Sequence, residues 1–209
     1  MSAILVIVGP SGVGKTTVAN RVVERSPSFE FVRSATTRAP RGDGNDSEYL
    51  YLTREEFLGR VNSGKMLEYM EYGGNLYGTP ASEVERIHSE GKTPLLVLDI
   101  EGAKSLRKGD FDFRSVILYV YEDLGVINAR LAARTGATEE SVARRRELNK
   151  RDYLSMPEIS HLFDDFLRNE TVDAAATEVM DIFSSICNGA TRPDAKIVEI
   201  STRLYNSAK

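Results

Sequence analysis

The sequence predicts an α/β fold in which a parallel sheet is flanked by helices, and three observations support this prediction. Apolar runs typical of buried strands alternate along the chain with amphipathic stretches typical of helices. A glycine-rich loop stands between the first apolar run and the first helical pattern. Short β-rich segments interrupt the alternation between residues 33 and 80. We therefore expect an alternating core that carries a β-rich insertion.

The glycine-rich loop fits the phosphate-binding pattern G-x-x-x-x-G-K-[ST], and it follows the apolar run Ala3–Val8 as the motif requires. Glycines let successive N–H groups point inward around a phosphate, and the helix N-terminus adds positive potential. Lys15 is expected to reach the β and γ phosphates of a nucleoside triphosphate, and Thr16 to ligate Mg²⁺. A turn that only links strand to helix is the alternative. The predicted nucleotide-binding residues are Gly9, Pro10, Ser11, Gly12, Val13, Gly14, Lys15, Thr16 and Thr17.

The composition is that of an ordinary globular protein. The chain has 209 residues, 41% of them hydrophobic and 28% charged, which is enough for one domain with a substantial core. Its net charge of −4 indicates neither a nucleic-acid surface nor an anionic-membrane surface. The single cysteine, Cys187, cannot form an internal disulfide, and the apolar N-terminal run is too short for a signal peptide. We expect a cytoplasmic protein, monomer or homodimer, without nucleic-acid or membrane partners.

Short elements bounded by turn residues follow the loop. The first helix should end near Arg25, because a Ser-Pro-Ser triplet comes next. The polar segment from Arg33 to Ser47 is rich in turn residues and predicts a loop. Thr53 and Glu56 fit a capping box, which marks the start of another helix. The strands expected in this region are Phe29–Val32 and Tyr49–Leu52.

The middle of the chain predicts a hairpin and then a buried strand. Met66–Tyr72 alternates apolar and polar residues, and Gly73–Asn75 provides the hairpin turn. A helix at 81–90 leads to an apolar strand at Thr93–Ile100, which contains Asp99. A hydrophobic run followed by an acid is the usual form of the second phosphate-loop signature, in which the carboxylate holds Mg²⁺ directly or through water. A purely structural acid at a strand end is the alternative.

The last third of the chain returns to strand and helix alternation. Thr138 caps a long, highly charged helix, because two glutamates follow it. The segment from Asn188 to Lys209 contains one apolar patch, and we assign it no role. The other elements expected are a strand at Ser115–Tyr121, a helix with the apolar stripe Leu124, Ile127 and Leu131, a last strand at His161–Leu167 and a last helix at Val172–Ile186.

The loop after residue 33 suggests a second phosphate site. Arg38 and Arg41 lie three residues apart on either side of Pro40. Guanidinium forks match phosphate oxygens bidentately, and a proline turn would hold two of them as a rigid clamp for a dianionic phosphate. Tyr49 and Tyr77 would add hydroxyl donors. A solvated basic loop is the alternative interpretation.

On these residues the chain resembles the guanylate kinases, which transfer the γ-phosphoryl group of ATP to GMP. It matches their GPSGxGK loop, their S-x-T-T-R-x-P-R-x-G segment at Ser34–Gly42, their acid at Glu68, their Tyr77-Gly78 pair and their lid start at Arg134–Glu140. The similarity spans about residues 3 to 186. It implies a P-loop NTPase core (1–32, 81–125 and 157–187), a mobile GMP-binding insertion (33–80) and a helical lid (126–156) within a domain at 1–187, followed by a tail at 188–209.

The resemblance also implies a role for each matching residue. Glu68 has independent chemical support, because a carboxylate can accept hydrogens from guanine N1 and N2, whereas adenine offers no such pair. Asp99 would hold Mg²⁺ with Thr16, and Asp99 and Glu101 would lie at the GMP site. The resemblance places Ser34, Glu68 and Thr79 on guanine, Arg38, Arg41, Tyr49 and Tyr77 on the GMP phosphate, Asn169 near adenine, and Lys15, Arg38, Arg134 and Arg145 around the transferred group.

Three departures from the family pattern concern base recognition. Thr79 replaces the usual Ser, Asp43 replaces the usual Glu, and Ile100–Gly102 is a shortened acid-containing segment. Two other functions stay open. One is a binding module of the same shape without catalysis, although such modules typically lack an intact phosphate loop. The other is a related kinase of a ribose phosphate, although Glu68 and Ser34 would then have no base to contact. GMP or dGMP with ATP and Mg²⁺ is the expected substrate set.

Overall fold

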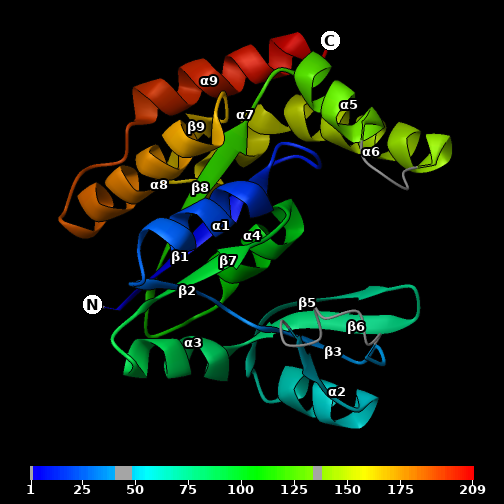
Figure 1. Cartoon of the computed structure of the whole chain (residues 1–209), viewed down its shortest axis with the longest axis vertical. Coiled ribbons are helices and arrows are strands. Elements are labelled where there is room, and N and C mark those ends of the chain that lie inside the picture. The colour runs from blue at the N-terminus through cyan, green and yellow to red at the C-terminus, as the bar shows by residue number, and fades with distance from the viewer. Residues whose placement is uncertain (1, 41–48, 134–137) are drawn as a thin grey trace.

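The computed structural model describes residues 2–40, 49–133 and 138–209, and its strands form two separate sheets (Figure 1). The larger sheet makes up the body of the molecule, and the smaller one lies in a lobe to one side of it. The predictions for Arg41, Asp43 and Arg134, and for the turns around residues 42–45, lie outside the described residues.

The larger sheet confirms the predicted parallel core. It contains β1 (Ala3–Val8), β2 (Phe29–Phe31), β7 (Thr93–Val97), β8 (Arg114–Tyr121) and β9 (Asp165–Arg168). Their order is β2-β7-β1-β8-β9, and every neighbouring pair is parallel. In the central strand β1, the side chains from Ile4 to Val8 are fully buried. Helices on both faces of a parallel sheet explain why this strand is an uninterrupted apolar run.

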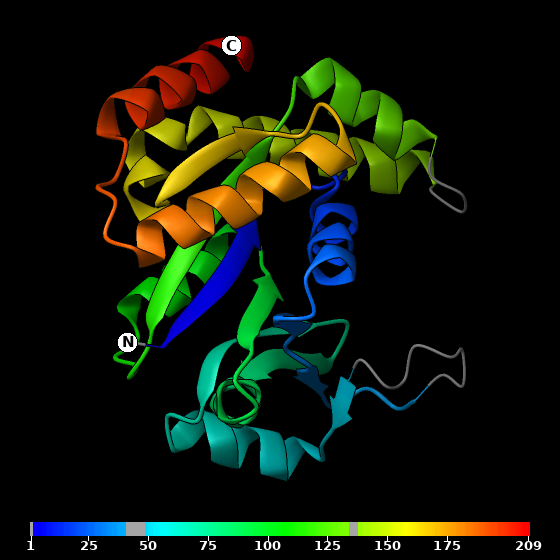
Figure 2. The same cartoon turned by 60° about the vertical axis from the view of Figure 1, so that its left-hand side comes forward.

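Helices cover both faces of this sheet. They are α1 (Lys15–Arg25), α3 (Ala81–Ser89), α4 (Ile100–Lys108), α5 (Leu124–Ala132), α6 (Glu139–Leu154), α7 (Met156–Ile159), the 3-10 helix η2 (Ser160–Leu162), α8 (Val172–Cys187) and α9 (Asp194–Ser207). Crossover connections carry the chain from β1 through α1 to β2, and from β7 through α4 to β8, as parallel strands require. Figure 2 shows α1 and α4 on opposite sides of β1. The helix α8 packs beside α1.

The smaller sheet confirms the expected β-rich character of the insertion. It is formed by β3 (Ser34–Thr36), β4 (Tyr49–Tyr51), β5 (Met66–Tyr72) and β6 (Asn75–Pro80), in the order β4-β3-β6-β5. The helix α2 (Arg54–Asn62) packs on one face through a small core of Ala35, Phe57, Met66 and Leu76. Its capping box is present, because the Thr53 hydroxyl accepts from the Glu56 N–H and the Glu56 carboxylate accepts from the Thr53 N–H.

The loop predicted from Arg33 to Ser47 is wrong at its start, because Ser34–Thr36 forms β3. This strand pairs in parallel with β4 and antiparallel with β6. Its three residues are too few to create an alternating pattern, so only its two neighbours reveal it.

The strand predicted at Thr93–Ile100 is too long. β7 ends at Val97, and Asp99 is the N-cap of α4, where its Oδ1 accepts the N–H of Gly102 at 2.8 Å. The helix α4 was not predicted from the sequence. An acid after an apolar strand can bind a ligand at the strand end or cap the following helix. In this structure Asp99 caps α4.

The end of the chain differs most from expectation. The strand predicted at His161–Leu167 begins only at Asp165, and residues 160–162 form η2. The helix α8 is not the last one, because α9 follows within the tail. This helix buries Ile197, Ile200 and Leu204 against α6, α7 and β9, so the tail is an integral part of the packed body.

Candidate active site

The phosphate loop lies at the carboxyl edge of the parallel sheet, between β1 and α1. Gly14 has a φ of 99°, and a Cβ there would lie 2.5 Å from Nδ2 of Asn169. A Cβ at Gly9 would lie 2.2 Å from the carbonyl oxygen of Val120. Glycine is therefore required at both positions, and the loop packs closely on the ends of β8 and β9.

The side chain of Lys15 folds back over its own loop. Its Nζ donates to the carbonyl oxygens of Gly9 at 2.7 Å and Pro10 at 3.1 Å. Burial lowers the pKa of this ammonium group to about 8, and the nearby carboxylates of Asp99 and Asp152 oppose the shift. A partly desolvated cation at the mouth of a phosphate loop is suited to bind an anion, because that contact would replace its lost hydration.

Three acids interact across the cleft floor. Burial raises the pKa of the Glu68 carboxyl, a hydrogen bond from Thr79 lowers it, and the charge of Asp99 raises it. Burial also raises the pKa of Asp152, where Arg151 opposes the shift and Asp99 adds to it. The charge of Asp99 therefore acts on the pKa of Lys15 in the phosphate loop and on the pKa of Glu68 in the insertion.

The residues predicted to hold Mg²⁺ offer the oxygen ligands that this ion prefers. Asp99 uses one carboxylate oxygen to cap α4, and Thr16 is exposed at the start of α1. No group of three or more potential His, Cys, Asp or Glu ligands occurs within residues 2–40, 49–133 and 138–209. The donors therefore fit an ion held largely by nucleotide phosphates and water, as is usual for Mg²⁺.

A cross-strand pair in the insertion forms the predicted base site. Glu68 lies opposite Thr79, whose buried hydroxyl donates to Glu68 Oε1 at 2.7 Å. Met70 and Tyr77 are the next such pair on the same face, since side chains two residues apart on a strand share a face. The other face of the sheet is covered by α2. The acid, the hydroxyl and these two side chains thus line one surface.

Ser34, predicted to contact guanine, and Tyr49 and Arg38, predicted to contact the GMP phosphate, lie on or next to the neighbouring strands β3 and β4. Ser34 and Tyr49 are paired in register between β3 and β4. The guanidinium carbon of Arg38 lies 5.5 Å from the centroid of the Tyr49 ring, a cation–π distance. Thr16, Ser34 and Tyr49 line the same pocket of about 210 Å³, so the structure brings a loop residue together with two acceptor-side residues.

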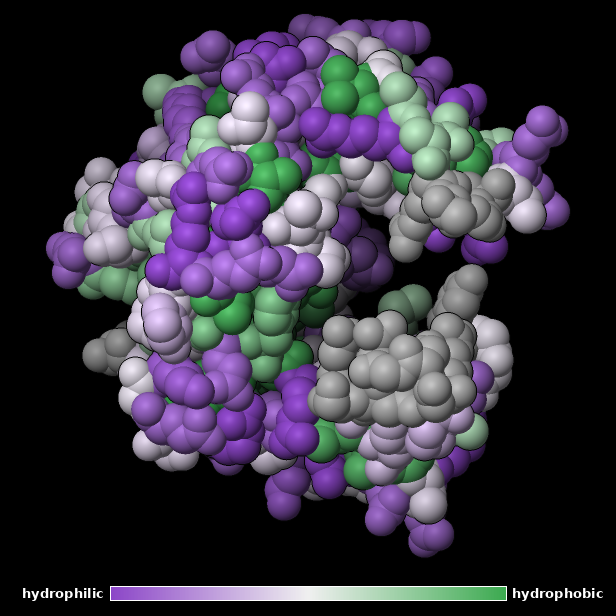
Figure 3. Space-filling model, viewed as in Figure 1, coloured by the Kyte–Doolittle hydropathy of each residue, from purple (hydrophilic) through white to green (hydrophobic). Residues whose placement is uncertain are grey.

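The lid lies on the opposite side of the phosphate loop. Arg145 of α6 lines a cavity of about 500 Å³ together with Thr138 and Ser11 of the phosphate loop. In the space-filling view, a hollow lies between the body of the molecule and the lobe that carries the smaller sheet (Figure 3). Arg145 therefore shares a cavity with the phosphate loop, and its role at the transferred group stays a prediction.

Two predicted residues have other contacts in the structure. Asn169 is 2% exposed, and its Nδ2 donates to the Val13 carbonyl at 2.7 Å, so it stabilises the backbone of the phosphate loop. Glu101 has a side chain that is 78% exposed and forms an ion pair with Lys104 at 2.7 Å. The roles of Asn169 at adenine and of Glu101 at guanine stay predictions.

Three residues of the cleft were not predicted from the sequence. Asn149 is 1% exposed and forms hydrogen bonds with Ser11, and the charge of Asp152 raises the pKa of Lys15. Both belong to the helix α6, which is rich in charged residues and has no apolar period that would indicate the buried side. Met70 could have been found, because strand alternation places it on the face of Glu68.

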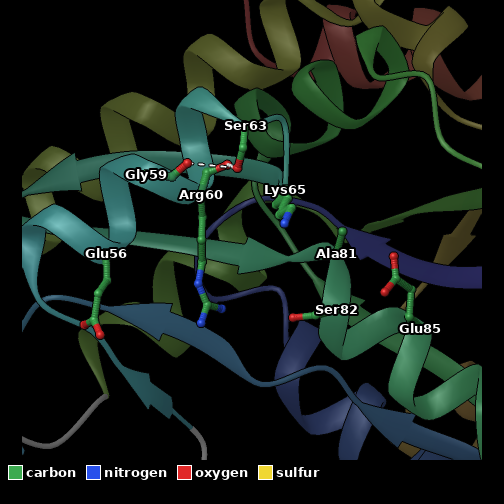
Figure 4. A pocket seen from close by; sticks show the side chains of 8 residues that line it. All are labelled: Glu56, Gly59, Arg60, Ser63, Lys65, Ala81, Ser82 and Glu85. Carbon is green, nitrogen blue, oxygen red and sulfur yellow. Dashed lines mark hydrogen bonds between the residues drawn. The ribbon is translucent and has the colours of Figure 1, made fainter.

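Another cavity, of about 590 Å³, lies outside the cleft, between the end of α2 and the start of α3 (Figure 4). Arg60 and Lys65 line it together with Glu56 and Glu85, so its charges are mixed. None of the predicted site residues lines this cavity.

No helix within the described ranges is both long enough and apolar enough to cross a membrane.

Comparisons with known proteins place these features in a family. A sequence model described as guanylate kinase matches residues 1–186. The guanylate kinase of Nocardia farcinica is 40% identical over 185 residues, which cover 87% of this chain and 93% of the relative. The guanylate kinase of Rubrobacter xylanophilus is 35% identical over 188 residues, covering 89% and 95%.

A solved structure agrees with the sequence comparisons. The crystal structure of guanylate kinase from Anaplasma phagocytophilum aligns with a TM-score of 0.57 at 25% identity, and it covers 88% of this chain and 86% of that one. The match to the family model ends at residue 186, before α9 begins.

Proposed function

The chain belongs to the guanylate kinase family, and from this premise we propose which residues of the cleft carry out the reaction of that family. The chain is an enzyme that transfers the γ-phosphoryl group of ATP to GMP, giving ADP and GDP. The observation that carries the proposal is a cavity that Thr16 of the phosphate loop lines together with Ser34 and Tyr49 of the insertion. The bonded pair of Glu68 and Thr79 belongs to the same small sheet.

On the ATP side, the phosphate loop would receive the β and γ phosphates. The ammonium group of Lys15 would exchange the carbonyls of Gly9 and Pro10 for phosphate oxygens and stabilise the charge that develops during transfer. Mg²⁺, bound with ATP, would neutralise phosphate charge, and the oxygens of Thr16 and Asp99 are available to hold it. Arg145 lines a cavity together with Ser11 of the loop, and its guanidinium group would contact the transferred phosphoryl group there.

On the GMP side, Glu68 would accept hydrogens from guanine N1 and N2, which requires its ionised form. Thr79 favours that form by donating to Oε1, and the bond also fixes the orientation of the carboxylate. Ser34 would contact the base from β3. Arg38, Tyr49 and Tyr77 would bind the phosphate of GMP together with Arg41. Two phosphate sites held in this way would align the acceptor oxygen for in-line attack.

The alternatives have weaker support. A binding module without catalysis would not need Lys15, Thr16 and Arg38 at the same cleft. A ribose phosphate kinase would not need a partly buried carboxylate that is hydrogen-bonded to a threonine hydroxyl. A coupled ADP-release assay with GMP, dGMP, AMP and ribose 5-phosphate separates these functions. We expect GMP to be used at least about 100-fold better than AMP. Equal use of AMP, or use of ribose phosphate alone, would contradict the assignment.

The cellular setting is also part of the proposal. We propose a cytoplasmic enzyme, monomer or homodimer, whose substrates are ATP and GMP or dGMP and which has no nucleic-acid or membrane partner.

A further inference from the structure

The lid helix α6 buries only two of its residues, Asn149 and Tyr153. They are four positions apart and so lie one above the other on a single face. Arg145, which lines the lid cavity, lies one further turn back on the same face. The buried stripe of this charged helix is therefore polar.

Each of the two buried side chains bonds both backbone groups of one residue. Asn149 accepts the Ser11 N–H on its Oδ1 at 2.8 Å, and its Nδ2 donates to the Ser11 carbonyl at 2.8 Å. The Tyr153 hydroxyl donates to the Glu122 carbonyl and accepts the Glu122 N–H at 3.2 Å. Ser11 belongs to the phosphate loop, whereas Glu122 follows β8. The first contact therefore joins the lid to the nucleotide site, and the second joins it to the core.

Helix stability does not account for Asn149. Asparagine is a poor helix former, and burying its amide is costly unless every polar atom finds a partner. Both of its polar atoms find theirs on the phosphate loop. Alanine or leucine would stabilise the helix more than asparagine does. The contribution of the amide is therefore its contact with the phosphate loop.

We propose that Asn149 is a positioning residue that holds the phosphate loop in its nucleotide-binding shape and fixes the base of the lid to it. The inference rests on the proposed function, because it deepens the role of the same site. The loop contains Gly9, Gly12 and Gly14, all with positive φ, and such residues gain much freedom when unrestrained. Held by Asn149, the loop does not have to be ordered when a nucleotide binds, and that lower cost appears as affinity.

The contact between Asn149 and Ser11 also links nucleotide binding to phosphoryl transfer. Because Arg145 precedes Asn149 by one turn, a lid helix anchored at Ser11 keeps the guanidinium group at a fixed distance from the loop. Without that anchor, the lid would keep its second attachment at Glu122 but lose its alignment with the phosphates. We expect nucleotide affinity and turnover to suffer together, while GMP affinity is unaffected.

The test compares Asn149→Ala with Tyr153→Phe in the full chain. Each change removes two hydrogen bonds between α6 and the rest of the molecule, but only the first affects the phosphate loop. Calorimetric titration with ADP and Mg²⁺, and separately with GMP, gives the affinities. Asn149→Ala should bind ADP about 10-fold more weakly and GMP within about twofold of the wild type, whereas Tyr153→Phe should bind both within about twofold.

Two further measurements exclude a purely structural explanation. Asn149→Leu keeps the number and branching of the side-chain heavy atoms while losing both hydrogen bonds, so it should lose ADP affinity even if the alanine variant unfolds. Hydrogen exchange at the Ser11 amide should accelerate in both Asn149 variants and stay slow in Tyr153→Phe. Wild-type ADP affinity in Asn149→Leu, or equal loss of ADP affinity in Tyr153→Phe, would overturn the inference. Neither measurement depends on GMP turnover, so a failure of the proposed function would be recognised separately.

Discussion

At the scale of single residues, Lys15 is the group on which phosphoryl transfer should depend most. We expect Lys15→Met to keep the fold, because an unbranched apolar chain of similar length can occupy the same space. Turnover should fall by at least about 100-fold, since the loop loses the cation that stabilises the transferring charge. Steady-state assays with ATP and GMP measure this. Turnover close to that of the wild type would show that Lys15 has another role.

The lowered pKa of Lys15 predicts a stability difference that depends on pH. The folded pKa is about 8 and the usual value is 10.5, so between these values the unfolded chain binds more protons and stability rises with pH. The cost of burying the charge is therefore complete below about pH 8 and disappears above pH 10.5. Below pH 8, ligand-free Lys15→Met should be more stable than the wild type by up to about 3 kcal/mol. Urea unfolding at pH 7 and pH 10 measures the difference, which should shrink at the higher pH. A difference that stays constant with pH would show that it does not arise from burial of the lysine charge.

At the scale of elements, the sequence predicted those that carry their own local signal. The capping box at Thr53 and the glycine turn after Tyr72 gave α2 and the β5–β6 hairpin correctly. β3 and α9 could not be predicted, because neither is stabilised locally. β3 is stabilised by its two partner strands, and α9 is stabilised by packing its apolar side against α6, α7 and β9. Asp99 was interpreted as a strand end because the same residue type also caps helices.

The candidate site divides in the same way. Sequence motifs indicate Lys15 and Glu68 as site residues, because a motif can be recognised in the sequence without knowledge of the packing. Asn149 and Asp152 could not, because tertiary packing alone decides which side of a charged helix is buried. The position of Ser11 opposite Asn149 connects residues 138 positions apart.

The tail helix gives a prediction at this scale. Leu204 is 3% exposed within α9, so Leu204→Ala should lower the free energy of unfolding by about 2–4 kcal/mol through the lost burial and the cavity. Because α9 lies beyond the match to the family model, KM for GMP should stay within about twofold of the wild type. Val198→Ala, at a position 62% exposed on the same helix, is the matched control and should change stability by less than about 0.5 kcal/mol. Equal effects of the two substitutions would mean that α9 does not pack as described.

At the scale of the whole molecule, a hollow lies between the body and the lobe of the smaller sheet (Figure 3), and we propose that ATP and GMP bind on its two sides. GMP and a non-hydrolysable ATP analogue together should bring the lobes closer and exclude water from the reacting groups. Small-angle scattering should show a smaller radius of gyration with both ligands than with either one alone. An unchanged radius with both ligands would contradict closure.

The central claim is that this molecule recognises guanine through Glu68 and transfers a phosphoryl group to the nucleotide that carries this base. The most direct test is kcat/KM for GMP and IMP in the wild type, Glu68→Gln and Arg38→Ala. Glu68→Gln places an NH₂ donor against a donor on guanine, so it should cost about 2–4 kcal/mol with GMP. The cost should be smaller with IMP, which lacks the N2 amino group. Arg38→Ala should weaken both substrates about equally, because it contacts only phosphate. An equal loss of GMP and IMP use in Glu68→Gln would contradict the claim.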